Sequence, residues 1–172
     1  MINFEIKNLL LIVLIAFIFI ACSKSDAQKE FENEAFRTPE NITETTANGS
    51  LVENGSVDPE DWRIGPDYQG LIRIDPAYPN PVNINSNLLI EVDFLFSNPV
   101  SELIVFTFQD PALELRFIDS FDQSSLGAID VLNIPAPQIA LPSGVGTSPV
   151  YRIIITDQNE NIITYGDVEV IQ

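Results

Sequence analysis

The stretch LLIEVDFLF at residues 88–96 decides the fold. From Ile90 onward every second side chain is apolar, while Glu91 and Asp93 point to the opposite side. This period of two predicts a β-strand with one face on a hydrophobic core. Proline-rich or Asn-Pro segments stand on both sides of it, at 75–81 and 98–99, and predict turns.

Outward from this strand, the chain repeats short apolar runs between turn signals. Residues 103–108 are apolar on both faces and predict a central strand. Further strands are expected at 70–74, 113–117, 128–134, 139–141, 151–156 and 162–171, with a loop at 120–127. Residues 62–172 therefore predict an all-β domain, an Ig-like antiparallel β-sandwich of about seven to nine strands.

Residues 22–61 precede this predicted domain and have a different composition. Acidic and small polar side chains dominate, and apolar residues are sparse without a sustained period. Phe31, Ala35 and Phe36 could form a brief amphipathic turn. A segment that buries so little apolar surface does not offset its ordering entropy. The sequence therefore predicts a disordered acidic linker.

An unbroken apolar run at residues 9–20 ends at Ala21 and Cys22, and it is too short to span a bilayer. Phe19-Ile20-Ala21-Cys22 resembles the lipobox of bacterial lipoproteins. The resemblance implies that 1–21 is a signal peptide, that cleavage follows Ala21, and that Cys22 carries acyl chains such as palmitate. A simple secretory signal or an uncleaved anchor are the alternatives.

Two motifs in the predicted sandwich resemble the C-terminal sorting domain of Bacteroidota proteins. The first is Tyr78-Pro79-Asn80-Pro81 ahead of an apolar strand. The second is Leu141-Pro142-Ser143-Gly144 followed by the strand that starts at Tyr151. The resemblance covers about residues 75–172 and implies a Bacteroidota-type β-sandwich. With the lipobox, it implies a lipid-anchored protein of the cell envelope. Ser23 after the cysteine, rather than Asp, favours the outer membrane by analogy with other bacterial lipoproteins, on either its periplasmic or its surface side.

Composition excludes several kinds of chemistry. The chain has no histidine and one cysteine, so Ser-His-Asp catalysis, a Cys/His zinc site and an internal disulfide are impossible. Its net charge of −17 argues against nucleic acid as a partner. We therefore expect no enzymatic activity and no cofactor. From the lipobox we expect two partners, which are the membrane through the anchor and another envelope protein.

Three groups of residues remain as candidate sites. Asp157, Asn159 and Asn161 have the spacing of a calcium loop, but these residue types also suit a tight hairpin turn. Trp62 and Tyr68 could form an aromatic platform for a ligand, or pack as a lid over the core. Glu91 and Asp93 could act as an acid–base pair, or lie on a solvated strand face.

The sequence thus favours a non-catalytic β-sandwich that serves protein interaction or assembly in the cell envelope. The alternative is a carbohydrate- or calcium-binding module, which would use the aromatic pair or the Asp157 loop. An enzyme is the third possibility, and it would require carboxylates that converge in a cleft.

Overall fold

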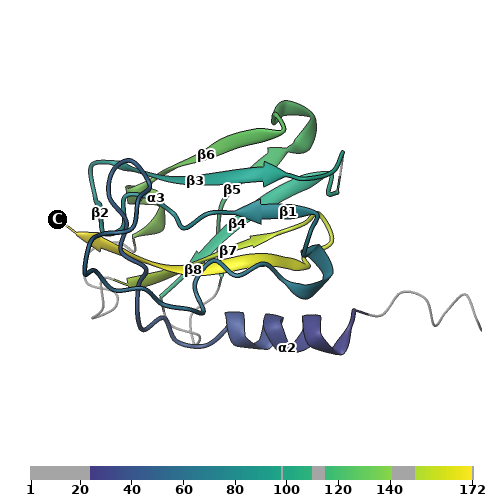
Figure 1. Cartoon of the computed structure of the whole chain (residues 1–172), viewed down its shortest axis with the longest axis horizontal. Helices are drawn as coiled ribbons and strands as arrows, with labels where there is room; N and C mark the ends of the chain where they lie inside the picture. The colour runs from purple at the N-terminus through teal and green to yellow at the C-terminus, as the bar shows by residue number, and fades with distance from the viewer. Residues whose placement is uncertain (1–23, 98, 110–114, 141–149, 172) are drawn as a thin grey trace, which may run out of the picture.

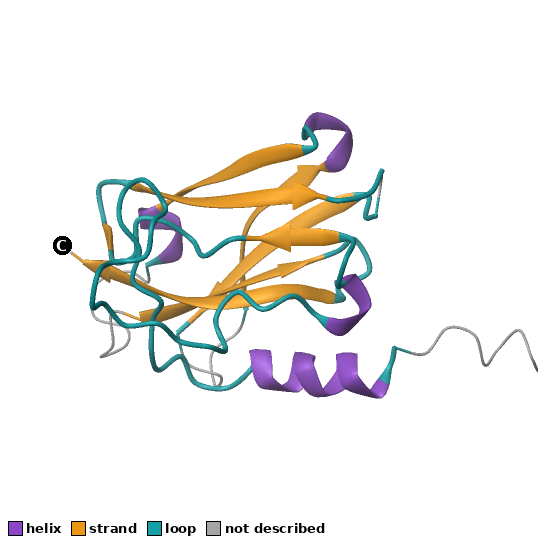
Figure 2. Ribbon diagram, viewed as in Figure 1, coloured by secondary structure: helices purple, strands orange, loops and turns teal. Residues whose placement is uncertain are grey.

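The computed structural model describes residues 24–97, 99–109, 115–140 and 150–171. Two β-sheets pack face to face and enclose the main hydrophobic core (Figures 1 and 2). The smaller sheet has the order β1 (Ile72–Ile74), β3 (Asn87–Phe94), β6 (Ile129–Pro135). The larger has the order β2 (Val82–Asn83), β8 (Ile162–Ile171), β7 (Val150–Thr156), β4 (Glu102–Phe108), β5 (Arg116–Asp122). The predicted all-β sandwich is confirmed.

The strand predicted at residues 88–96 is β3, the middle strand of the smaller sheet. Its side chains alternate as expected, with Leu88, Ile90 and Val92 fully buried. The prediction was wrong for Phe96, whose side chain is 63% exposed. Pairing with β1 and β6 ends near Phe94, so Phe96 lies beyond the sheet.

The larger sheet also follows the pattern of its sequence. β4 lies between β5 and β7, which confirms the central position predicted from its two apolar faces. In β7 and β8 nearly every described side chain is buried. One face of these strands supplies Ile153, Ile155 and Ile163 to the core between the sheets. Their other face must therefore be covered by a further layer.

Three local predictions need correction. β2 pairs with β8 in parallel, so the sheets are not purely antiparallel. Ile139 ends the short helix α3 (Ala136–Ile139), because a proline in the first helical turn suits a helix start better than a strand. β5 continues to Asp122, into the segment predicted as a loop from residue 120. The motif at 141–144 lies outside the described residues.

Residues 24–61 are folded, which overturns the predicted linker and the predicted start of the domain at Trp62. Helix α2 (Asp26–Ala35) lies along the larger sheet (Figure 1). Its side chains Phe31 and Ala35 join a second core on the outer face of that sheet, with Phe108, Ile154, Ile162 and Tyr165. This burial offsets the entropy that the acidic composition alone would leave unopposed.

The segment between α2 and β1 is tied to the sandwich by buried polar contacts. Asn80, fully buried, donates from Nδ2 to the carbonyls of Thr43 (3.0 Å) and Asp167 (2.9 Å). Its Oδ1 accepts from the backbone N–H of Glu169 at 3.0 Å. Thr45 exchanges backbone hydrogen bonds with Asn80. The Asn of the Tyr-Pro-Asn-Pro motif thus joins the N-terminal segment to β8.

Candidate functional site

The Asp157 loop is the hairpin turn between β7 and β8. Asp157 Oδ1 accepts from the backbone N–H groups of Asn159 (2.9 Å) and Asn161 (2.8 Å). Its Oδ2 accepts from Asn161 Nδ2 (2.9 Å) and from the Tyr68 hydroxyl (2.8 Å). Burial opposes these hydrogen bonds, but together they lower the pKa of Asp157. The turn interpretation is confirmed, and both carboxylate oxygens already serve protein donors.

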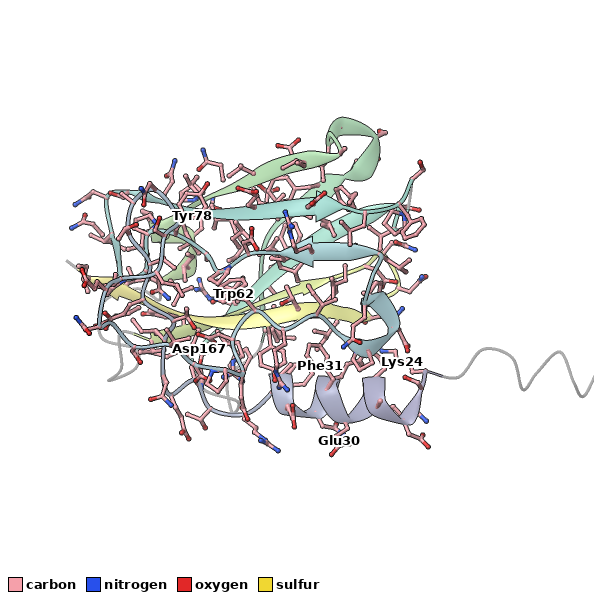
Figure 3. The ribbon with its side chains drawn as sticks, in the orientation of Figure 1. Lys24, Glu30, Phe31, Trp62, Tyr78 and Asp167 are labelled. Carbon is pink, nitrogen blue, oxygen red and sulfur yellow. The ribbon has the colours of Figure 1, made fainter. Side chains whose placement is uncertain are left out.

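Trp62 and Tyr68 do not form an exposed platform. Both rings are buried, at 4% and 7% exposed, and both belong to the main core. The indole of Trp62 packs on Gly166 of β8 (Figure 3). The Tyr68 hydroxyl is used by Asp157, and burial raises the pKa of Tyr68. A sugar could not stack on either ring without unpacking the core, so the platform interpretation was wrong.

Of the two carboxylates of β3, Asp93 is paired with a cation. Asp93 lies directly opposite Arg73 of β1 and forms an ion pair with it at 3.1 Å. Within the described ranges, no three Asp, Glu, His or Cys side chains gather as metal ligands would. This strand face therefore carries a cross-strand ion pair that joins β1 to β3.

The predicted modification site lies outside the described residues, since both Ala21 and Cys22 precede Lys24. In the part of the chain that the structure describes, no helix has both the length and the apolar character needed to cross a bilayer.

A buried ion pair holds the C-terminal end of α2 against the sheet. Arg152 and Asp167 face each other on β7 and β8 and form two hydrogen bonds, of 2.6 and 2.8 Å. Arg152 Nη1 also donates to the carbonyls of Glu34 and Arg37, at 3.2 and 3.3 Å. The guanidinium therefore neutralises Asp167 and caps the last turn of the helix at once.

Asp61 adds a second buried carboxylate beside this pair. It accepts from the backbone N–H groups of Asp167 and Thr43, both at 2.8 Å. Burial is the largest influence on it and raises the pKa of Asp61 to about 7, with added repulsion from Asp167 and opposition from the hydrogen bonds. The group can take up a proton near neutral pH, yet its contacts are structural.

An apolar groove runs beside α2 on the outer face of the larger sheet. Its volume is about 230 Å³. Phe36 just after the helix, Phe106 of β4 and Leu115 just before β5 line it, together with Ile154 and Ile162 from its floor strands. Phe36 and Leu115 remain 45% and 40% exposed. These side chains come from well-separated segments and meet only because α2 docks on the sheet.

Two polar features accompany this apolar surface. Thr156 lines the groove, and its hydroxyl is buried without a hydrogen-bond partner among the described residues. Glu32 and Glu160 also line the groove. Lys24 neutralises Glu32 at 2.7 Å, whereas Glu160 forms no ion pair with any described residue. The groove thus offers a partner apolar contact and a negative charge.

No protein-family model matches this sequence, and comparison with curated proteins and with solved structures found no significant match. These comparisons therefore give no information on the function of this chain.

Sequence reasoning missed the groove because it took the helix for part of a linker. One signal for the helix was present. Ser25 and Gln28 have the spacing of a capping box, and the Ser25 hydroxyl does accept from the Gln28 N–H at 3.1 Å. The apolar pair Phe31 and Ala35, four residues apart, then marks the buried side of the helix.

Proposed function

We propose that this chain is a lipid-anchored cell-envelope protein whose β-sandwich acts without catalysis as a protein-interaction module. The apolar run that ends at Cys22 supports the anchor. The groove beside α2 supports the interaction, and it is the single observation that carries the proposal. Exposed aromatic and aliphatic side chains around a defined hollow are typical of surfaces that bind another protein.

The chemistry of the groove favours one kind of partner segment. Phe36, Phe106 and Leu115 would surround an aromatic or aliphatic anchor side chain. The carboxylate of Glu160 and the net charge of −17 favour Lys or Arg beside that anchor.

Selection from a random peptide library by the full chain in detergent micelles tests this proposal. The expected result is enrichment of peptides with one large apolar residue next to Lys or Arg. Leu115→Ser should weaken binding of a selected peptide at least about tenfold, because it removes an apolar side chain that lines the groove. A tenfold loss of affinity corresponds to about 1.4 kcal/mol of binding free energy. Glu160→Lys should also weaken the binding of basic peptides.

Val131→Ser is the matched control. Val131 is 39% exposed, close to the value for Leu115, but it lies on β6 in the other sheet. This variant should bind as the parent does. Selection of peptides without a shared pattern, or equal loss in the two serine variants, would contradict the groove as the binding site.

A further inference from the structure

The end of the sandwich where the chain enters the fold also carries an exposed apolar turn. Lys24, the helix η1 (Pro66–Tyr68), the turn after β3 and the helix η2 (Gln123–Ser125) all lie at this end (Figures 1 and 3). Direct contacts connect them. Ser25 Oγ donates to Asp67 of η1 at 2.8 Å, and η1 leads to Leu71, whose carbonyl accepts from the N–H of Leu95.

The turn after β3 presents large apolar side chains without cover. Leu95 is 48% exposed and Phe96 is 63% exposed. They line an open hollow of about 320 Å³, whose other wall includes Leu126 and Ala128 from the segment after η2. Adjacent exposed Leu and Phe at a turn tip are typical of a surface that meets an apolar phase.

The length of chain before the fold determines how far this end can lie from an anchor. Only Ser23 separates Cys22 from Lys24, and two residue steps span at most about 7 Å. Helix α2 begins at once and is held to the sandwich at its first turns. Gln28 Nε2 donates to the carbonyl of Ile162 at 2.8 Å, and Gln28 Oε1 accepts from the N–H of Asp67. A lipid on Cys22 would therefore hold this end at the bilayer surface.

We infer that this end of the sandwich is a membrane-facing surface, on which Leu95 and Phe96 enter the interfacial layer of the bilayer. The inference rests on the proposed anchor at Cys22. The turn alone is too small to bind lipid, and the net charge of −17 opposes adsorption to anionic membranes. Its part is to orient a domain that acyl chains already hold.

Coupling the only thiol to a synthetic lipid tests the orientation directly. Every described core side chain lies at or after Phe31, so the chain from Cys22 onward keeps the whole described core. Its Cys22 is coupled to a maleimide lipid in phosphatidylcholine vesicles. In a Phe96→Trp variant, the fluorescence emission of the new indole should shift to the blue. Bromine-labelled acyl chains should quench most of this emission. The buried Trp62 gives a constant background, measured in the parent protein.

Phe117→Trp is the matched control. Phe117 is 61% exposed, almost the value of Phe96, but it lies at the opposite end of the larger sheet, near the start of β5. Its indole should be neither shifted nor quenched. Equal responses of the indoles at positions 96 and 117, or no response at position 96, would overturn the inference. An indole at position 96 that stays in water would indicate that the turn binds a protein instead of lipid. Because the coupling supplies the anchor, these outcomes do not depend on whether cells acylate Cys22, which fatty-acid labelling of the parent and a Cys22→Ala variant decides separately.

Discussion

Gly166 shows how a single missing side chain fixes the packing of the N-terminal segment. A Cβ at this position would lie 2.3 Å from Cε2 of Trp62, far inside van der Waals contact. The indole is 4% exposed and cannot move aside without opening the core. The backbone N–H of Trp62 also donates to the carbonyl of Tyr165 at 2.7 Å. This hydrogen bond fixes the main chain of Trp62 against β8 and so keeps its ring over that strand.

Replacement of Gly166 by alanine should therefore destabilise the protein. Overpacking of this kind costs about 1–3 kcal/mol, and urea unfolding followed by circular dichroism measures it. The control is a double-mutant cycle with Trp62→Leu, which removes the atoms that the new methyl group would meet. The penalty of Gly166→Ala should shrink in that background. An equal penalty with and without the indole would show that the packing assigned to Gly166 is wrong.

Individual residues also show where sequence reasoning stops. The hairpin turn at Asp157 was predictable because Asp and Asn hydrogen-bond to their own local backbone. The burial of Trp62 was predictable only as one of two alternatives, since its contact, Gly166, is remote in the sequence. The role of Asn80 between Thr43 and β8 depends on three segments and left no local pattern.

At the scale of elements, strands with one buried face were predictable and helix α2 was not. The alternation in β3 was readable because each side chain is apolar or polar according to the sheet face on which it lies. In α2, acidic residues outnumber apolar ones, and the helix is stable only because β7 and β8 present an apolar outer face to it. The run Ile153-Ile154-Ile155 carried that information, since a strand that is apolar on both faces needs a cover on each. The groove combines Phe36, Phe106 and Leu115 from separate segments, so it followed only from the docked helix.

The docking of α2 predicts resistance to trypsin near residues 29 and 37. A disordered linker would be cut quickly after Lys29 and Arg37, whereas a docked helix must first open locally. Phe31→Ala should accelerate cleavage at Lys29, because it removes a side chain that is 6% exposed and contacts Tyr165 with ring centroids 5.0 Å apart. Loss of a buried Phe side chain costs about 3–5 kcal/mol. Mass spectrometry of timed digests identifies the cut sites.

The exposed face of the same helix supplies the control. Asn33→Ala changes a solvent-facing position and should leave the cleavage rate close to that of the parent. Rapid cutting of the parent at Lys29, as fast as in Phe31→Ala, would indicate that α2 is not docked in solution.

For the whole molecule, acidity and burial combine to set the dependence of stability on pH. With a net charge of −17, the folded chain repels itself at neutral pH, and partial protonation relieves this repulsion. Asp61 acts in the same direction. Its folded-state pKa is raised from 3.8 to about 7, so between these values the folded state holds a proton that the unfolded state has released. The free energy of unfolding therefore falls as the pH rises from about 4 to 7.

Asp157 limits this trend at the acidic side. Its pKa is lowered in the folded state, so its contribution to stability is present above 3.8 and is lost as the pH falls below that value. Greatest stability is thus expected slightly above pH 4, well below neutrality. Urea unfolding at half-unit pH intervals from 3 to 8 locates the maximum.

Asp61→Asn separates the buried carboxylate from the general charge. The amide cannot accept from the N–H groups of both Thr43 and Asp167, so the variant should be less stable at every pH. The decisive measurement is its slope between pH 4 and 7, which should be flatter than that of the parent by at most about 1.4 kcal/mol per pH unit. Asp75→Asn, at an exposed position, should keep the parental slope. If moderate sodium chloride abolished the whole slope of the parent, surface repulsion alone would account for it and Asp61 would have no part, because salt screens exposed charges far more than buried ones.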